Sequence, residues 1–150
     1  MALPGFDGDA SPPEAHTNQA INVKSERLRS HRAVEDVHVT GLRAGNLNQL
    51  LQVSMYYHWH IPPQPASLTP VFRNLVFEDL HAISSGQMSW LGLPESPIRN
   101  MRFTDVVIDA YDAHETNCTH VSNLTVSNFT ANGANADAVT MSTCAGYPPP

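Results

Sequence analysis

The sequence lacks the features of several large classes of protein. No apolar run approaches the roughly 20 residues that a membrane-spanning helix needs. Lysine occurs once, at Lys24, and 14 acidic residues outnumber 8 basic ones, which gives a net charge of −6 without a basic cluster. The chain therefore gives no electrostatic reason to expect a nucleic acid as a partner.

A helical periodicity is missing as well. No window holds apolar residues at i, i+3, i+4 and i+7 over three turns, which argues against a helical solenoid. The length of 150 residues allows at most one ordinary domain. With 15% charged residues, 41% hydrophobic residues and 12 prolines, the composition is typical of a loop-rich globular protein and not of a disordered one.

A nine-residue pattern occurs four times in the chain. An apolar residue is followed by two polar residues ending in Asn or Asp, then by two apolar residues that alternate with other residues, a small turn former and a last apolar residue. The starts of the four copies lie 38, 26 and 23 residues apart. The copies are Val34–Leu42, Phe72–Leu80, Ile98–Val106 and Val121–Phe129. Self-similarity at such a period indicates stacked units, none of which buries its apolar face alone.

The pattern within each copy predicts an all-β protein. Alternating apolar residues share one face of a strand. The turn formers Gly41, Asp79, Asp105 and Asn128 can bend the chain before the next apolar residue points inward again. We therefore predict a right-handed parallel β-helix, truncated to about four or five coils. The alternative is an antiparallel sandwich with strands at regular spacing.

The predicted domain organisation has three parts. Residues 1–20 hold Gly, Pro, Asp and Ser with little apolar periodicity and read as a disordered lead-in. Residues 21–143 hold the β-helix coils, with a final short strand at Val139–Met141. Residues 144–150 form a Pro-rich tail.

The two ends of the sequence favour different compartments. The first residues have neither the basic nor the apolar region of a secretory signal. Asn117, Asn123 and Asn128 each begin an N-glycosylation sequon. Cys118 and Cys144 are candidates for a disulfide that closes a loop of about 26 residues. Both the absence of a secretory signal and the presence of sequons and a candidate disulfide are expected if the chain is a piece of a larger secreted protein. Alternatively, Asn123 and Asn128 are corner residues stacked in a ladder, and both thiols stay reduced.

One loop concentrates aromatic residues and histidines. Tyr56, Tyr57 and Trp59 stand beside His58 and His60. A His-x-His pair can bind a metal, but no third ligand stands at a telling spacing, and we expect neither a metal nor a cofactor. The aromatic rings favour a wall that stacks on sugar faces, or the filling of a loop core.

The order of these segments resembles the carboxy-terminal third of the polygalacturonases, glycoside hydrolase family 28. The resemblance covers about residues 21–131 and is most specific over Gly92-Leu-Pro-Glu-Ser-Pro-Ile-Arg-Asn-Met101. Upstream, Val23-Lys-Ser-Glu-Arg-Leu-Arg-Ser is similar to the family's Arg-Ile-Lys motif and the loop after it, with the lysine at Lys24 and Asn22 in place of the arginine. Tyr57 matches the tyrosine that closes the following strand.

The resemblance implies a secreted enzyme that hydrolyses α-1,4-linked galacturonan of the cell wall with inversion. In this family, one carboxylic acid protonates the leaving oxygen while a carboxylate activates water on the opposite face. Lys24 would bind the uronate carboxylate of the substrate and Tyr57 would contact the sugar. The absence of a guanidinium at Asn22 removes a charged hydrogen bond worth about 1.5–3 kcal/mol, which weakens uronate binding or shifts it towards a neutral sugar.

The family's catalytic motifs are absent from this chain. It contains no Asn-Thr-Asp, no Asp-Asp and no Gly-His-Gly, and Asp7 and Asp9 stand in the lead-in. We therefore assign no catalytic residue. The polypeptide as given is expected to be inactive alone, and to be monomeric in a full-length form. The alternatives are a glycan-binding module that does not cut its ligand and a purely structural β-helix.

Overall fold

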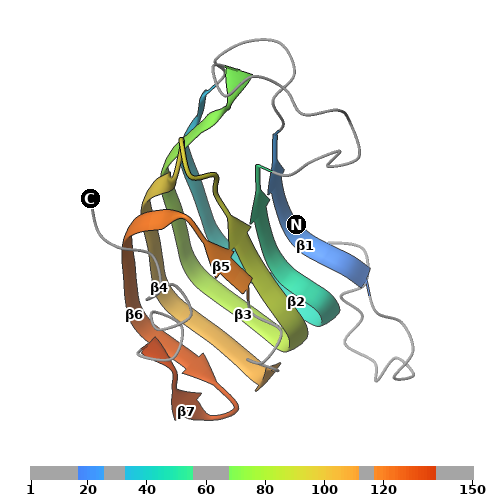
Figure 1. Ribbon diagram of the computed structural model, residues 1–150. Coiled ribbons are helices and arrows are strands. Elements are labelled where there is room, and N and C mark those ends of the chain that lie inside the picture. The colour runs from blue at the N-terminus through green and yellow to red at the C-terminus, as the bar shows by residue number, and fades with distance from the viewer. Residues whose placement is uncertain (1–16, 26–32, 56–67, 112–116, 138–150) are drawn as a thin grey trace.

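The computed structural model describes residues 17–25, 33–55, 68–111 and 117–137, which are almost entirely β-structure (Figure 1). These residues form seven strands and contain no helical element. The strands are β1 (Thr17–Lys24), β2 (Ala33–Ser54), β3 (Val71–Leu91), β4 (Ile98–Tyr111), β5 (Asn117–Thr119), β6 (Val121–Ala131) and β7 (Ala134–Asn135). The predicted all-β class is confirmed. The lead-in ends earlier than expected, because β1 already begins at Thr17.

The strands form one mostly parallel sheet in the order β1-β2-β3-β4-β6-β7, and β5 also pairs with β3. Each pairing is parallel except that of β6 with β7. In the register, Val34 lies opposite Phe72, and Ile98 lies opposite Val121. These partners are equivalent positions of the sequence repeat. The antiparallel sandwich considered from the sequence is therefore wrong for the described residues between 34 and 129.

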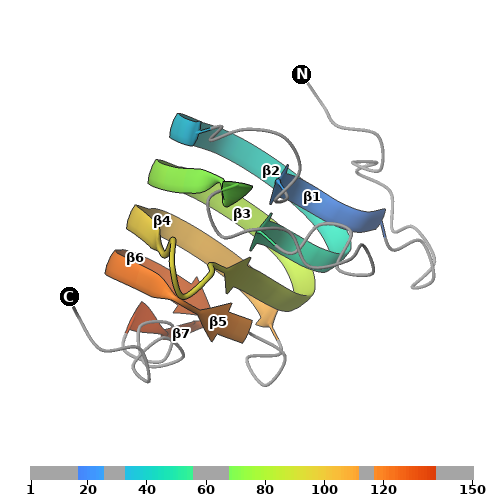
Figure 2. The same ribbon diagram turned by 45° about the horizontal axis from the view of Figure 1, so that its top comes forward.

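The sheet is curled, so that β2 and β3 each have two limbs that face each other across the core (Figures 1 and 2). We call residues 33–46, 71–84, 98–110 and 121–131 the first limb. Residues 17–24, 47–54, 85–91 and 117–119 are the second limb. β1 pairs only with the second limb of β2, and β5 pairs with the second limb of β3.

Corners within the first limb are made by Asn and Asp in the left-handed conformation, with φ between 52° and 57°. Small polar side chains tolerate this conformation better than other residues do. The predicted corners Asp79, Asp105 and Asn128 are confirmed, and Gly41 takes the same role with φ 71°. The polar residue five positions earlier is a second corner in every copy; of these, the sequence pattern suggests only Asn123 as a corner. These earlier corners are Asp36, Asn74, Asn100 and Asn123.

The earlier corners stack into a continuous hydrogen-bonded ladder. Asn74 Nδ2 donates to Asp36 Oδ1 at 2.8 Å, and Asn100 Nδ2 donates to Asn74 Oδ1 at 3.0 Å. Asn123 Nδ2 then donates to Asn100 Oδ1 at 2.7 Å. These bonds join residues 38, 26 and 23 positions apart, the same intervals as in the repeat.

The core is a set of apolar stacks between the two limbs. Phe77 and Phe103 stack with ring centroids 5.4 Å apart, and Trp90 from the second limb lies 5.3 Å from Phe103. Phe129 meets Phe103 edge-on at 6.3 Å. These four side chains are buried, and each contributes about 1.5–3 kcal/mol through the area that it removes from water.

A short hairpin closes the carboxy-terminal side of the described sheet. Asn132 and Gly133 both have positive φ, as a two-residue hairpin turn requires, and β7 returns antiparallel to β6. The Asp137 carboxylate accepts the backbone N–H groups of Phe129 at 2.6 Å and Asn128 at 3.2 Å. The strand predicted at Val139–Met141 lies outside the described residues.

No helix in the described segments is both long and apolar enough to cross a membrane.

Candidate functional site

The outer side of the second limb carries the residue that the sequence singled out. Lys24 is the last residue of β1, lies opposite Ser54 and is exposed. Its neighbour Val23 lies opposite Val53, which is fully buried, so strand alternation places Lys24 on the outer side. Tyr57, the second predicted substrate contact, lies outside the described residues.

Next to Lys24, the outer side of the second limb holds a hydrogen-bonded cluster of amides, which we call the amide network. Gln19 Nε2 donates to Gln49 Oε1 at 2.8 Å and to Gln52 Oε1 at 2.9 Å. Gln49 Nε2 donates in turn to Ser89 Oγ at 2.8 Å. Asn22 Nδ2 donates to Gln19 Oε1. The amide network thus links three neighbouring strands, β1, β2 and β3.

A break in the strand register makes the amide network possible. Gln49 lies opposite Gln87, whereas Leu51 lies opposite Met88, so one extra residue is accommodated in β2 at this point. Such a bulge shifts the alternation by one residue. Gln49 and Gln52, three positions apart, can therefore both bond to Gln19.

Part of the amide network is buried in the second limb, so it belongs to the packed structure as well as to the surface. Gln49 is 4% exposed and Ser89 5% exposed. Buried amides must be hydrogen-bonded, since an unmade bond costs about 1–3 kcal/mol. Gln52 is half-buried and Asn22 is exposed. Among the described residues, Gln52 Nε2 and Asn22 Oδ1 have no further partner, so they can bond to groups outside the wall.

The structure gives Asn22 a role that the sequence did not reveal. Asn22 donates to Gln19 and lies two residues before Lys24, on the same outer side of β1. Sequence reasoning missed Gln19, Gln49, Gln52 and Ser89. The available signal was the pair of glutamines that flank Leu50 and Leu51 in an otherwise apolar strand.

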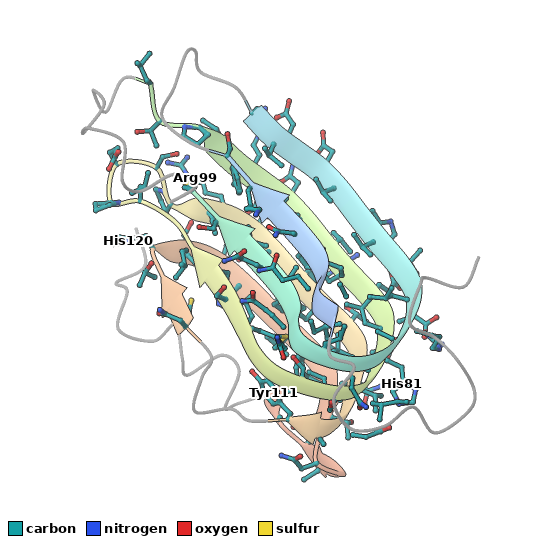
Figure 3. All side chains as sticks on the ribbon, turned by 90° about the vertical axis from the view of Figure 1, so that its right-hand side faces the viewer. His81, Arg99, Tyr111 and His120 are labelled. Carbon is teal, nitrogen blue, oxygen red and sulfur yellow. The ribbon has the colours of Figure 1, made fainter. Side chains whose placement is uncertain are left out.

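The outer side of the first limb is charged instead. His38 Nε2 lies 3.1 Å from Glu78 Oε2, and His81 Nε2 lies 3.0 Å from Asp109 Oδ2. Arg43 Nη2 lies 2.7 Å from Asp79 Oδ1, and Arg73 pairs with Glu35. These side chains are 37–54% exposed, so water screens their interactions. Figure 3 labels two residues of this side, His81 and Arg99.

The predicted glycosylation sites differ in their surroundings. Asn117 begins β5 and is exposed. Asn123 belongs to the corner ladder, and Asn128 Nδ2 donates to Asp105 Oδ1 at 2.6 Å, which is the stacked-corner alternative considered for both residues. Glycosylation stays a prediction at all three positions.

The cysteine prediction concerns one described residue. Cys118 lies opposite Trp90 and takes part in a disulfide. Cys144 lies outside the described residues, so the pairing of Cys118 with Cys144 stays a prediction.

Metal ligands do not gather in the part of the chain that the structure describes, where no group of three or more His, Cys, Asp or Glu residues is placed to hold an ion. His58 and His60, together with the neighbouring aromatic residues, lie outside this part. The same is true of Asp7 and Asp9.

Comparisons of the chain with protein-family models, with curated proteins and with solved structures find no match.

Proposed function

We propose that this chain is a segment of a polygalacturonase-like right-handed parallel β-helix whose second limb holds an acidic, pectic polysaccharide. The observation that carries the proposal is the outer side of the second limb, where Lys24 stands beside the amide network. In the family, the hydrolysis of α-1,4-galacturonosyl linkages takes place on such a wall.

Three observations support the β-helix. Equivalent residues of successive repeats are parallel neighbours, the corner ladder joins every copy, and each long strand curls around the same core. A chain that returns to the same side after each parallel strand makes a crossover connection, and such connections are right-handed in nearly all proteins. The proposed handedness rests on this rule.

The chemistry of the second limb suits a carboxylated sugar chain. Lys24 supplies a positive charge for a uronate carboxylate. Gln52 Nε2 supplies donors and Asn22 Oδ1 an acceptor for sugar hydroxyls. Gln19 holds both side chains in place before a ligand arrives, because its Nε2 donates to Gln52 Oε1 and its Oε1 accepts from Asn22 Nδ2, which reduces the entropy lost on binding.

Binding without cleavage is the activity that we propose for the chain as given. An inverting glycosidase needs two carboxyl groups about 6.5–9.5 Å apart, one on each side of the scissile bond. The motifs that carry these groups in the family are absent from the sequence. Hydrolysis is therefore the activity of the polygalacturonase family, and glycan binding is the activity that we propose for this chain.

A binding and turnover experiment with the variant Lys24→Gln tests the proposal. Wild type is titrated with oligogalacturonate by calorimetry, and reducing ends are assayed with polygalacturonate. We expect binding without turnover, with an affinity about tenfold lower in K24Q, because one charged hydrogen bond is lost.

The matched control is Arg43→Gln, which removes the same charge from the first limb. Equal losses of affinity in K24Q and R43Q would show that only net charge matters and would refute a site at Lys24. If wild type did not bind oligogalacturonate at all, the proposal would be refuted and the chain would be interpreted as a purely structural β-helix.

A further inference from the structure

Among the described residues, two exposed arginines at the start of β4 form no ion pair, although Arg99 lies opposite Arg73 of β3, which pairs with Glu35. Arg99 and Arg102 lie on either side of the corner residue Asn100. In the parallel register, Arg99 is opposite Ser122 and Arg102 is opposite Thr125, both on β6. Arg99 with Ser122 and Arg102 with Thr125 are therefore two pairs of register neighbours, one on each side of the corner. Figure 3 shows Arg99 near His120, where the chain enters β6.

The acidic side chains of this side are already engaged with other residues. Glu35 pairs with Arg73, Glu78 with His38, Asp79 with Arg43 and Asp109 with His81. Asp36 and Asp105 accept hydrogen bonds from corner asparagines.

Among the described residues, neither Arg99 nor Arg102 forms a hydrogen bond or an ion pair. A chain with 8 basic and 14 acidic residues thus presents two uncompensated arginines side by side. Folding alone does not require this arrangement, because an exposed arginine without a partner adds little to stability. A guanidinium group offers paired N–H donors that match the two oxygens of a carboxylate or sulfate.

We infer that Arg99 and Arg102, with the hydroxyls of Ser122 and Thr125, form a second anion-binding site that takes the carboxylate or sulfate groups of an acidic polysaccharide. The site lies on the first limb, whereas Lys24 lies on the second. The choice of a polysaccharide as the anion's carrier rests on the proposed function. The hydroxyls of β6 provide neutral partners for sugar hydroxyls next to the two charges.

The test compares two double variants with the same change in net charge. R99Q/R102Q removes the two unpaired arginines, and R43Q/R73Q removes two arginines that are already bonded to Asp79 and Glu35. Each protein is titrated at low salt with polygalacturonate, with dextran sulfate and with fully methyl-esterified pectin, and its fold is checked by thermal melting. We expect R99Q/R102Q to weaken the binding of at least one anionic polymer about tenfold or more. R43Q/R73Q should change the same affinity less than about threefold.

The three polymers identify the source of the anion. Binding of polygalacturonate that depends on Arg99 and Arg102 assigns a carboxylate, and the same dependence with dextran sulfate assigns a sulfate. Equal losses in the two double variants, or unchanged binding in R99Q/R102Q, would overturn the inference. So would equally tight binding of the uncharged esterified pectin.

The variant K24Q separates this inference from the proposed function. If K24Q weakens binding and R99Q/R102Q does not, the second-limb site stands and the second anion site is wrong. If only R99Q/R102Q weakens binding, the first-limb site stands and the assigned role of Lys24 is wrong.

Discussion

The two limbs of the sheet present opposite chemistry to the solvent while they share one core. The first limb carries exposed ion pairs such as His38 with Glu78 and Arg43 with Asp79. The second limb carries the amide network, in which Gln49 and Ser89 are buried. Exposed ion pairs contribute little to stability, whereas buried amides are costly when they lose a partner.

The difference teaches that the fold and the candidate sites are encoded by different side chains of the same strands. On the inner side, both limbs follow one rule, because Phe77 and Phe103 of the first limb and Trp90 of the second are buried in the same apolar core. Only the outer side differs between the limbs. Changes there should separate binding from folding.

The largest effect is expected at Gly92, where the second limb of β3 ends. A Cβ atom at Gly92 would lie 2.2 Å from the backbone oxygen of His120 and 2.9 Å from the backbone nitrogen of Ile98. Backbone atoms of the neighbouring segments cannot move aside easily, so we expect Gly92→Ala to cost about 3 kcal/mol or more in the free energy of unfolding. Urea denaturation followed by tryptophan fluorescence measures it.

Gly133 provides the control for this substitution. It has φ 75° and nothing within 4 Å of an added Cβ, so Gly133→Ala should cost only the left-handed strain of about 1–2 kcal/mol. If G133A destabilised the protein as much as G92A, the close contact between the two limbs' ends would not be the cause.

The next largest effect is expected in the amide network. Gln49→Ala removes the donor to the buried hydroxyl of Ser89 and one of the two acceptors of Gln19 Nε2, which should cost about 1–3 kcal/mol. Thermal and urea unfolding measure the loss. The conservative variant Gln49→Glu tests the same point, because a carboxylate cannot donate to Ser89 and its burial is unfavourable.

The contrast with the first limb comes from Glu78→Gln. It removes an exposed ion pair with His38, and we expect a change of at most about 1 kcal/mol. A loss as large as that of Q49A would abolish the energetic difference between the two limbs. Both variants are measured in the same buffer at pH 6, at low and at high salt, since only the ion pair should respond to screening.

A smaller, pH-dependent effect is expected at the closing hairpin. The hydrogen bond from the backbone N–H of Phe129 lowers the pKa of Asp137 from its ordinary value of 3.8, against the opposing effect of burial. The side chain of Asn135 and the N–H of Asn128 lower this pKa further.

Because the pKa is lowered in the folded state, the stabilisation is fully present above about pH 4. It is lost as the pH falls through the lower pKa of the folded state. Urea midpoints of wild type and Asp137→Asn, measured between pH 2 and pH 7, should differ at neutral pH and converge in acid. A constant difference across this range would contradict the assigned role of the carboxylate.

The repeat made the first-limb fold predictable from the sequence. The alternation of apolar and polar residues places Leu75 and Phe77 inside. Asp79 forms a corner because aspartate tolerates the left-handed backbone conformation. Both properties can be read from the local sequence. Parallel pairing then follows from stacking equivalent residues. The hairpin at Asn132-Gly133 also had a local signal, an Asn-Gly pair, which the sequence analysis did not use.

The amide network was not predictable in the same way. It depends on the bulge at Gln49 and on the register that places Gln19 of β1 opposite Gln49. The sequence repeat, which covers only the first limb, gives no information on either feature. The unpaired state of Arg99 and Arg102 likewise depends on which neighbours engage the acidic residues. Such features arise from the register between neighbouring strands, which a single sequence does not specify.

A nuclear magnetic resonance titration with trigalacturonate tests the central claim most directly. The account predicts that the side-chain amide signals of Gln52 and Asn22 and the ammonium-bearing methylene of Lys24 shift in wild type with one common affinity. The signals of buried core residues such as Phe103 should stay in place. Saturating ligand that leaves all three second-limb side chains unperturbed would contradict the claim that this wall holds an acidic sugar chain.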